Sequence, residues 1–223
     1  MTRGVSNAQQ RALNLSGRAL ARDVIPDSVI DHFNDTLYKN RGKSISDYYS
    51  GNLSDFIRQE STVYSGSHAL ECDPTDAVAI TSTSGLNNYP TKGNKFQYWS
   101  YATDNSINDT YVGFGIPSES GYDRLTGYFV TLEPTGGQFR IRRFDDGTPE
   151  TLTTESNNPP VNEWIRYEIY WQENNDIDVT VYDTEDNQIS LLSTNDNNYQ
   201  GNGIGFVSVN NDNPVYWDNI KLI

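Results

Sequence analysis

Two short stretches of the sequence decide the fold class: Gln138-Phe139-Arg140-Ile141-Arg142 and Asp178-Val179-Thr180-Val181-Tyr182. In both, apolar and polar residues alternate, which is the period of a β-strand with one buried face. Phe139 and Ile141 therefore share one face, and the arginines share the other. Each stretch predicts a strand at the surface of a core.

Similar runs recur along the chain, separated by turn-forming residues such as Asp-Asp-Gly at 145–147. The segment 34–53 is polar and irregular, and we expect it to be a surface loop. So many short strands without a long interior helix predict an all-β antiparallel sandwich. The expected strands are 29–33, 54–59, 68–72, 77–83, 94–102, 110–116, 126–132, 137–144, 163–172, 176–183, 187–193, 202–209 and 214–222.

An arm with a different pattern precedes the strands. Ser6 and Gln9 fit a capping box, and Ala8, Ala12, Leu15 and Ala19 follow at helical spacing. These features predict a short helix over about 7–22. The expected organisation is an arm over 1–28 and one sandwich domain over 29–223.

The charge is strongly negative, with 30 acidic residues, 16 basic residues and a net charge of −14. Acid-rich, lysine-poor surfaces suit concentrated salt, where screening weakens carboxylate repulsion. We therefore predict a halophilic protein that loses compactness on desalting; an unchanged melting curve between dilute buffer and molar salt would contradict this. An ordinary acidic protein is the alternative. Such a surface is a poor partner for nucleic acid.

The arm is basic, whereas the rest of the chain is acidic. Residues 1–25 carry Arg3, Arg11, Arg18 and Arg22 against Asp23 alone. A basic arm on an acidic body indicates contact with an acidic surface, such as a sister subunit. The assembly residues predicted here are Arg3, Arg11, Leu15, Arg18 and Arg22.

The sequence gives no support for a disulfide, a zinc cluster, a membrane span or an ordinary secretory signal. Cys72 is the only cysteine, which excludes an intrachain disulfide and a zinc cluster, and its apolar surroundings predict a buried thiol. No apolar stretch approaches the length of a membrane span, and the N-terminus lacks the apolar segment of an ordinary secretory signal.

Four segments together resemble the concanavalin A-like jelly roll, in its laminin-G-like branch. They are the opening strand Val29–Asp35, the pair of strands around Ser61–Glu71, Asn162–Trp171 with the hairpin after it, and the closing strand Val215–Leu222. The resemblance covers about 29–223 and leaves the arm outside. Domains of this kind are common in haloarchaeal surface proteins and haloviral virion proteins.

Catalysis is not expected. Glycosidase relatives carry two carboxylates on one strand, close enough to act as acid and nucleophile. The strand with Glu168 offers a single acid, and no Ser-His-Asp spacing occurs. Sugar binding through a paired Mn/Ca site is not expected either, because its Glu-x-Asp strand is missing.

The resemblance implies a structural calcium ion as the one candidate cofactor. Its ligands would be Asp31, Asp35 and Asp218, with Glu71 nearby, since calcium takes six to eight oxygen ligands. The alternative is that these acids are solvated, or that Asp218 binds a turn through hydrogen bonds.

Glycan binding would use aromatic faces beside planar polar groups. The candidates are Tyr122, Asp123 and Arg124 in a Gly/Ser-rich loop, the outward-facing Arg140 and Arg142, and beside them Tyr111 and Tyr98. Two alternatives weaken the prediction. The arginines could pair with the many acids, and Trp99, Trp164 and Trp217 are expected to be core residues.

These observations favour a non-enzymatic virion protein of a halophilic virus. The arm would dock it to other virion proteins as a homo-oligomer, and the sandwich would project from the particle surface and contact host glycans. The alternative is a carbohydrate-binding module or surface adhesin of a halophilic archaeon, located outside the cell.

Overall fold

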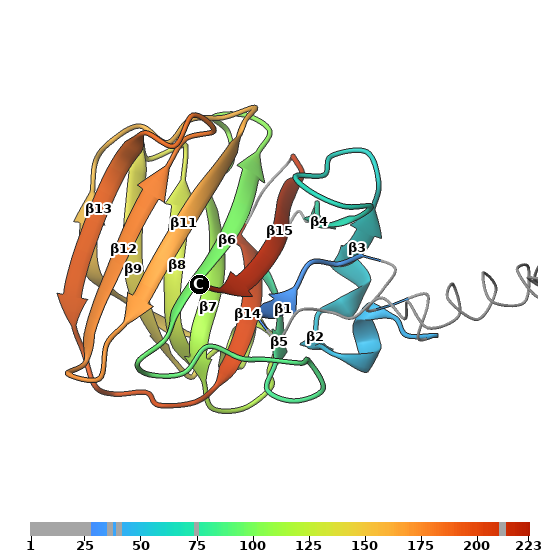
Figure 1. Ribbon diagram of the computed structural model, residues 1–223, viewed down its shortest axis with the longest axis horizontal. Coiled ribbons are helices and arrows are strands. Elements are labelled where there is room, and N and C mark those ends of the chain that lie inside the picture. Colours follow the sequence, from blue (N-terminus) through green and yellow to red (C-terminus); the bar gives the residue numbers. More distant parts are fainter. Residues whose placement is uncertain (1–27, 35–37, 39–41, 74–75, 210–212) are drawn as a thin grey trace, which may run out of the picture.

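The computed structural model describes residues 28–34, 38, 42–73, 76–209 and 213–223. Two antiparallel sheets pack face to face (Figure 1). Sheet A runs in the order β13 (Gln188–Asn195), β12 (Asp176–Tyr182), β11 (Trp164–Trp171), β6 (Lys95–Ala102), β15 (Val215–Leu222), β4 (Ala69–Cys72) and β3 (Phe56–Gln59), with β1 (Val29–Asp31) also paired to β15. Sheet B runs β10 (Thr148–Glu155), β9 (Gln138–Asp145), β8 (Gly127–Glu133), β7 (Asp109–Ile116), β14 (Gly203–Val209), β5 (Val78–Ser82) and β2 (Ser50–Gly51).

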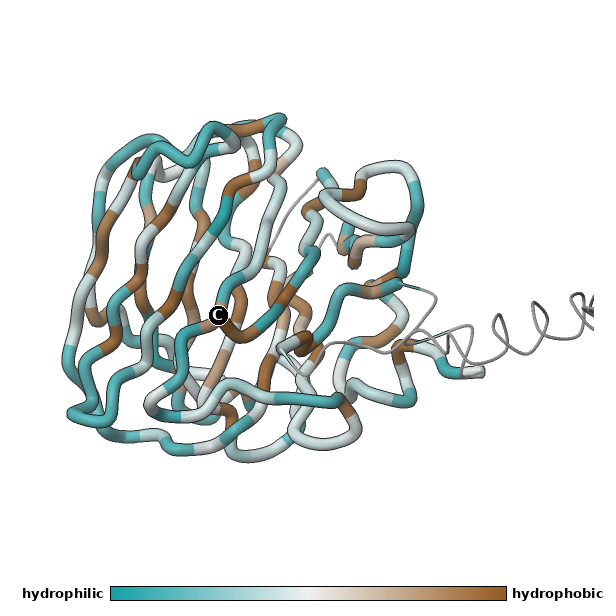
Figure 2. The backbone as a smooth tube through the Cα atoms, in the orientation of Figure 1, coloured by the Kyte–Doolittle hydropathy of each residue, from teal (hydrophilic) through white to brown (hydrophobic). Residues whose placement is uncertain are grey.

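Alternation along the strands builds the core between the sheets. On β11, buried and half-buried residues alternate without a break, and Figure 2 shows the same alternation of apolar and polar residues on neighbouring strands. Aromatic rings fill much of the interior. Tyr98 stacks on Tyr167 with ring centroids 4.6 Å apart, and Trp171 and Trp217 are fully buried. This confirms the predicted all-β sandwich.

One full strand was missed by the sequence analysis. β10 is polar on both sides, because it is an edge strand whose residues are all exposed or half-buried. The turn before it carried a usable signal. Asp146 and Gly147 both have positive φ, at 46° and 80°, which is the signature of a two-residue hairpin turn. An Asp-Gly pair before a threonine-rich run therefore indicates a second hairpin strand.

The prediction that 34–53 is a surface loop is wrong for the part of it that the structure describes. Two 3-10 turns, η2 (Ile45–Asp47) and η3 (Leu53–Asp55), flank β2. Tyr38 and Tyr49 are buried at 0% and 2% exposure. Their hydroxyls both donate hydrogen bonds to Asp31, at 2.6 and 2.8 Å. A polar segment can be buried in this way when its polar groups find partners.

Other expectations concern the chain outside the sandwich. The predicted helix over 7–22 and its arginines lie outside the described residues. Cys72 is free and buried, as predicted. Among the described residues, no helix has the length and apolar character needed to cross a membrane.

Candidate functional site

The outer face of sheet B carries a second hydrophobic cluster, separate from the core between the sheets. Phe144 lies at its centre, with Phe129 and Tyr111 edge-on at centroid distances of 5.0 and 5.7 Å. Gly113 makes room for this packing, because a Cβ there would lie 2.2 Å from the ring of Phe129. The loop after β7 adds Tyr122, whose ring meets Phe144 at 6.2 Å.

Beside this cluster lies a network of two arginines and two carboxylates. Arg142 donates to Asp109 at 3.1 Å and to the hydroxyl of Tyr111 at 2.5 Å. Arg140 pairs with Glu133 and lies 4.0 Å from Asp109. The four charged side chains are only 14–18% exposed. The sequence alternative that the outward arginines pair with acids is therefore what the structure shows.

Burial perturbs the ionisable groups of this face. It raises the pKa of Glu133, and the negative charge of Asp109 adds to the effect, while Arg140 and Arg142 oppose it. Burial also raises the pKa of Tyr122, and Asp109 and Arg142 act on the same group. Tyr122 is thus within electrostatic reach of the arginine network.

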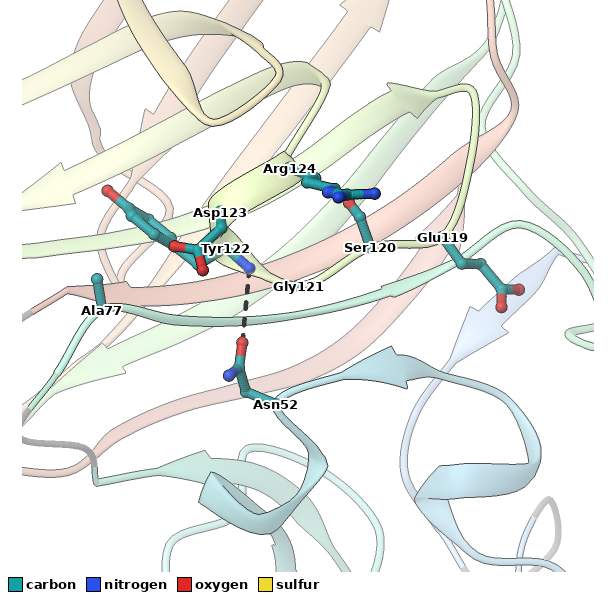
Figure 3. Close-up of a pocket in the computed structure, with 8 residues that line it drawn as sticks. All are labelled: Asn52, Ala77, Glu119, Ser120, Gly121, Tyr122, Asp123 and Arg124. Carbon is teal, nitrogen blue, oxygen red and sulfur yellow. Dashed lines mark hydrogen bonds between the residues drawn. The ribbon is translucent and has the colours of Figure 1, made fainter.

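A pocket of about 340 Å³ opens beside Tyr122 (Figure 3). Its walls come from the loop after β7 and from Asn52, which precedes η3. The 3-10 turn η4 (Tyr122–Arg124) places three consecutive side chains along the pocket. Tyr122 and Asp123 extend to one side of the loop in Figure 3, and Arg124 extends to the other.

Hydrogen bonds fix the walls of this pocket but leave polar groups free. The Asn52 side-chain oxygen accepts from the backbone of Ala79 at 3.1 Å and of Tyr122 at 3.5 Å. Its amide nitrogen takes part in none of the hydrogen bonds found in the described part of the chain. The hydroxyl of Ser120 is buried and has no partner among the same residues. The Ser50 hydroxyl, donating at 2.7 Å, holds the pKa of Glu119 below its ordinary value.

The structure divides the predicted glycan residues into two adjoining groups. Tyr111, Arg140 and Arg142 belong to the network on the sheet, and Asp123 and Arg124 line the pocket. Tyr122 lines the pocket and packs on Phe144, which contacts Tyr111 of the network. Tyr98 does not join them; it points into the interior on the opposite sheet, against Tyr167.

Several residues of this site were missed by the sequence analysis. They are Asn52, Asp109, Glu119, Ser120 and Glu133. Period two along β8 places Glu133 on the same face as Phe129, so this residue could have been found. Asn52 could not, because it lies 70 positions before Tyr122 and reaches it only through the pairing of β2 with β5.

The predicted calcium ligands lie in different surroundings. Asp31 and Asp218 are both fully buried. Burial raises the pKa of Asp218 to about 7, and the charge of Asp31 adds to this effect. Glu71 is half-buried on β4, and Asp35 lies outside the described residues. Within the described residues no three acidic, histidine or cysteine side chains gather as a metal site would require. Calcium stays a prediction.

The oxygens of these two aspartates are instead taken by hydrogen-bond donors. Asp31 accepts from two tyrosine hydroxyls and from the backbone of Phe33 at 2.8 Å. Asp218 accepts from the backbone of Tyr64, Ser65 and Asn219 at 3.1, 2.8 and 2.6 Å. The sequence alternative in which Asp218 binds a turn therefore describes the observed contacts.

Two of the three tryptophans expected in the core lie elsewhere. Trp217 is in the core between the sheets, but Trp99 and Trp164 belong to neither hydrophobic cluster. Strand period places them on the outer face of sheet A. Tyr64 stacks on Trp99 with centroids 3.7 Å apart, which leaves Trp99 only 5% exposed. A tryptophan in a strand motif can therefore be buried without facing the core.

No protein-family model matches the chain, and a search of the curated proteins finds no match. Among solved structures, the chain is similar to the carbohydrate-binding module CBM66 from Bacillus subtilis, with 10% identity, a TM-score of 0.57, and coverage of 77% of this chain and 92% of that one. A legume lectin-like domain from Entamoeba histolytica gives 8% identity, a TM-score of 0.53, and coverage of 77% and 89%. A carbohydrate esterase from Shiga toxin-encoding bacteriophage phi24B gives 9% identity and a TM-score of 0.52, and the match covers 87% of this chain and 97% of that one. At these identities the likeness concerns the fold, and the fold is the concanavalin A-like lectin and glucanase β-sandwich.

Proposed function

We propose that this protein is a non-enzymatic carbohydrate-binding domain whose ligand occupies the pocket beside Tyr122. The observation that carries the proposal is the set of polar side chains gathered at that pocket: Asp123 and Arg124 are exposed there beside the ring of Tyr122, and Asn52 and Glu119 line the same walls. The hydroxyl groups of a sugar are natural hydrogen-bond partners for these side chains. The similarity of the fold to the carbohydrate-binding module CBM66 and to a legume lectin-like domain supports the same class of ligand.

The chemistry of the pocket suits a sugar. Tyr122 offers an aromatic edge, and Asp123 and Arg124 are exposed and offer an acceptor and a planar donor. Such pockets combine an apolar surface with a few convergent polar groups that fix orientation. The ring of Tyr122 packs on Phe144, which packs in turn on Tyr111, the hydroxyl partner of Arg142.

The finer expectations from the sequence are part of this proposal. They are the laminin-G-like branch, a halophilic source, a location outside the cell or on a virion, a structural calcium ion and a homo-oligomer assembled through the arm. The virion role rests on the arm, which lies outside the described residues. The carbohydrate-binding alternative rests on the pocket, and we therefore prefer it.

The test is a titration of the full chain with oligosaccharides, selected by first probing a glycan array. We expect Asp123→Ala with Arg124→Ala to weaken binding at least tenfold, because each lost charged hydrogen bond is worth roughly 1.5–3 kcal/mol. Both side chains are exposed, so the fold should be kept. Glu155→Ala on the exposed edge strand β10 is the matched control and should bind as the parent does.

Two outcomes would overturn the proposal. One is that no glycan on the array binds, and the other is that the double variant binds as tightly as the control. Release of reducing sugar or of acyl groups from a bound glycan would contradict the non-enzymatic part alone.

A further inference from the structure

We infer that the chain has a second sugar site, on the outer face of sheet A, and that it can therefore bridge two glycans. This inference rests on the proposed carbohydrate-binding function and extends it to a new surface. A groove of about 480 Å³ crosses β6, β11, β12 and β13. These four strands lie side by side in sheet A (Figure 1). The groove lies on sheet A, whereas the Tyr122 pocket is built by loops next to the outer face of sheet B, against which Tyr122 packs, so the two sites lie on opposite sides of the sandwich.

The strand register arranges the groove as two rows of side chains. Lys95, Tyr170 and Asp178 are direct partners across β6, β11 and β12. Glu168, Thr180 and Leu191 are direct partners across β11, β12 and β13. Neighbouring strands are roughly 4.8 Å apart, a spacing comparable to that between hydroxyls on opposite edges of a pyranose ring. A ring lying in the groove can therefore reach groups on adjacent strands at once.

The rows combine the groups that hold a sugar. Asp178 is already oriented by hydrogen bonds from Ser193 at 2.6 Å and from Gln172 at 2.5 Å. A carboxylate has about four lone-pair positions, so Asp178 keeps capacity for ligand hydroxyls. Lys95 supplies a donor and lies 4.9 Å from the centre of the Tyr170 ring.

Leu191 gives the groove an apolar rim. Its exposure of 53% is the highest among the large hydrophobic side chains in the described part of the chain. It stands next to Thr180, so an apolar surface and a hydroxyl adjoin each other. The C–H face of a pyranose can pack on the apolar side chain of Leu191, and its hydroxyls can form hydrogen bonds with the hydroxyl of Thr180.

The charges of the groove select among sugars. The groove is lined by the carboxylates of Glu168 and Asp178 and the ammonium group of Lys95, and Arg166 beside it pairs with Glu168 at 3.5 Å and with Asp186 at 3.0 Å. The three carboxylates therefore outnumber the two cations. An anionic ligand would meet net repulsion at close range. The ligand class is therefore a neutral pyranoside, and a uronic acid of the same configuration should be rejected.

The position of the two sites decides what they can do together. Sites on one face would raise the avidity for one glycan surface. Sites on opposite faces cannot contact the same flat surface, so they link two separate chains. A single domain of this kind would cross-link polysaccharides.

The experiment is an NMR titration of the full chain with the methyl glycosides of glucose, galactose, mannose and N-acetylglucosamine, and with methyl glucuronide as the anionic probe. We expect amide shifts at 168–170 and 178–180 in addition to those at 119–124. Glu168→Gln with Tyr170→Ala should weaken the sheet A response at least tenfold and leave the response of the Tyr122 pocket unchanged. Asp123→Ala with Arg124→Ala should do the reverse. Glu185→Gln, an exposed acid in the turn between β12 and β13, is the control.

The outcomes separate the second site from the proposed function. If a neutral pyranoside perturbs only 119–124, or if the Glu168 and Tyr170 variant responds as the control does, the second site is wrong and the function stands. If only sheet A responds, the groove holds and the Tyr122 pocket is wrong. An equal response to methyl glucuronide at sheet A would overturn the ligand class, and no response at either surface would overturn both proposals.

Discussion

Replacing Asp31 by alanine is expected to lower the free energy of unfolding by about 3–5 kcal/mol, one of the largest effects of any single substitution in this chain. Asp31 is fully buried, and one of its oxygens accepts hydrogen bonds from the hydroxyls of both Tyr38 and Tyr49. Without it, three buried donors lose their acceptor, namely the two tyrosine hydroxyls and the backbone N–H of Phe33, at roughly 1–3 kcal/mol each. Chemical denaturation in molar salt, with the parent chain alongside, measures the difference.

The partners of Asp31 provide the control for this prediction. Tyr38→Phe and Tyr49→Phe each remove one donor and should cost about 1 kcal/mol. Combining both with Asp31→Leu removes the acceptor and the two hydroxyl donors together, and should recover much of the loss, because only the backbone N–H of Phe33 then lacks its partner. If the triple variant is no more stable than Asp31→Ala, the hydrogen bonds are not the reason for the effect.

The hydrogen bonds of Asp31 with Tyr38 and Tyr49 could not be predicted from the sequence. Asp31 was predicted as functional because it opens a strand of a resembling family, and calcium was the implied partner. Its observed partners are tyrosines from a segment that looked like a surface loop. Tyr38 and Tyr49 lie 7 and 18 positions away, and no local pattern links them to Asp31. Only the folded chain brings them to one place.

Strands with one buried face were predictable, and strands without one were not. β9 and β12 show clean alternation because one side of each faces the core. β10 has no buried side and β2 is only two residues long, so hydrophobic period could reveal neither. The same period gave the right face for Arg140 and Arg142 but left open what they bind. Their partners Asp109 and Glu133 come from two other strands.

For Trp99, the family motif led to a wrong prediction, because it indicated a residue in the core between the sheets. Period two alone places it on the face opposite Tyr98, which lies in the core. What buries it is Tyr64, from the segment between β3 and β4. That segment is held in turn by Asp218, which accepts hydrogen bonds from the backbone of Tyr64 and Ser65.

The stability of the chain is expected to fall as the pH rises from about 4 to about 7, with Asp218 as a principal cause. Burial raises the pKa of Asp218 to about 7 in the folded state, against 3.8 for the ordinary side chain. Between these values the folded protein holds a proton that the unfolded chain releases, so raising the pH favours unfolding. Each unit of pKa difference is worth about 1.4 kcal/mol, which gives an upper value of about 4 kcal/mol. The dependence should level off above pH 7 to 8.

Asp218→Asn isolates this contribution, because the amide does not titrate. The difference in unfolding free energy between parent and variant should change with pH over the range 4 to 7 and be constant above it. Other groups titrate nearby, since burial raises the pKa of Asp31 and lowers that of His32, but they remain in both proteins. Hydrogen exchange at Tyr64 and Ser65 gives a local readout: their amides should exchange faster in the variant at pH 8, where the parent carboxylate is charged and accepts most strongly. A difference in unfolding free energy that stays flat from pH 4 to 8 would mean that Asp218 is ionised throughout, and that its three backbone donors outweigh the cost of its burial.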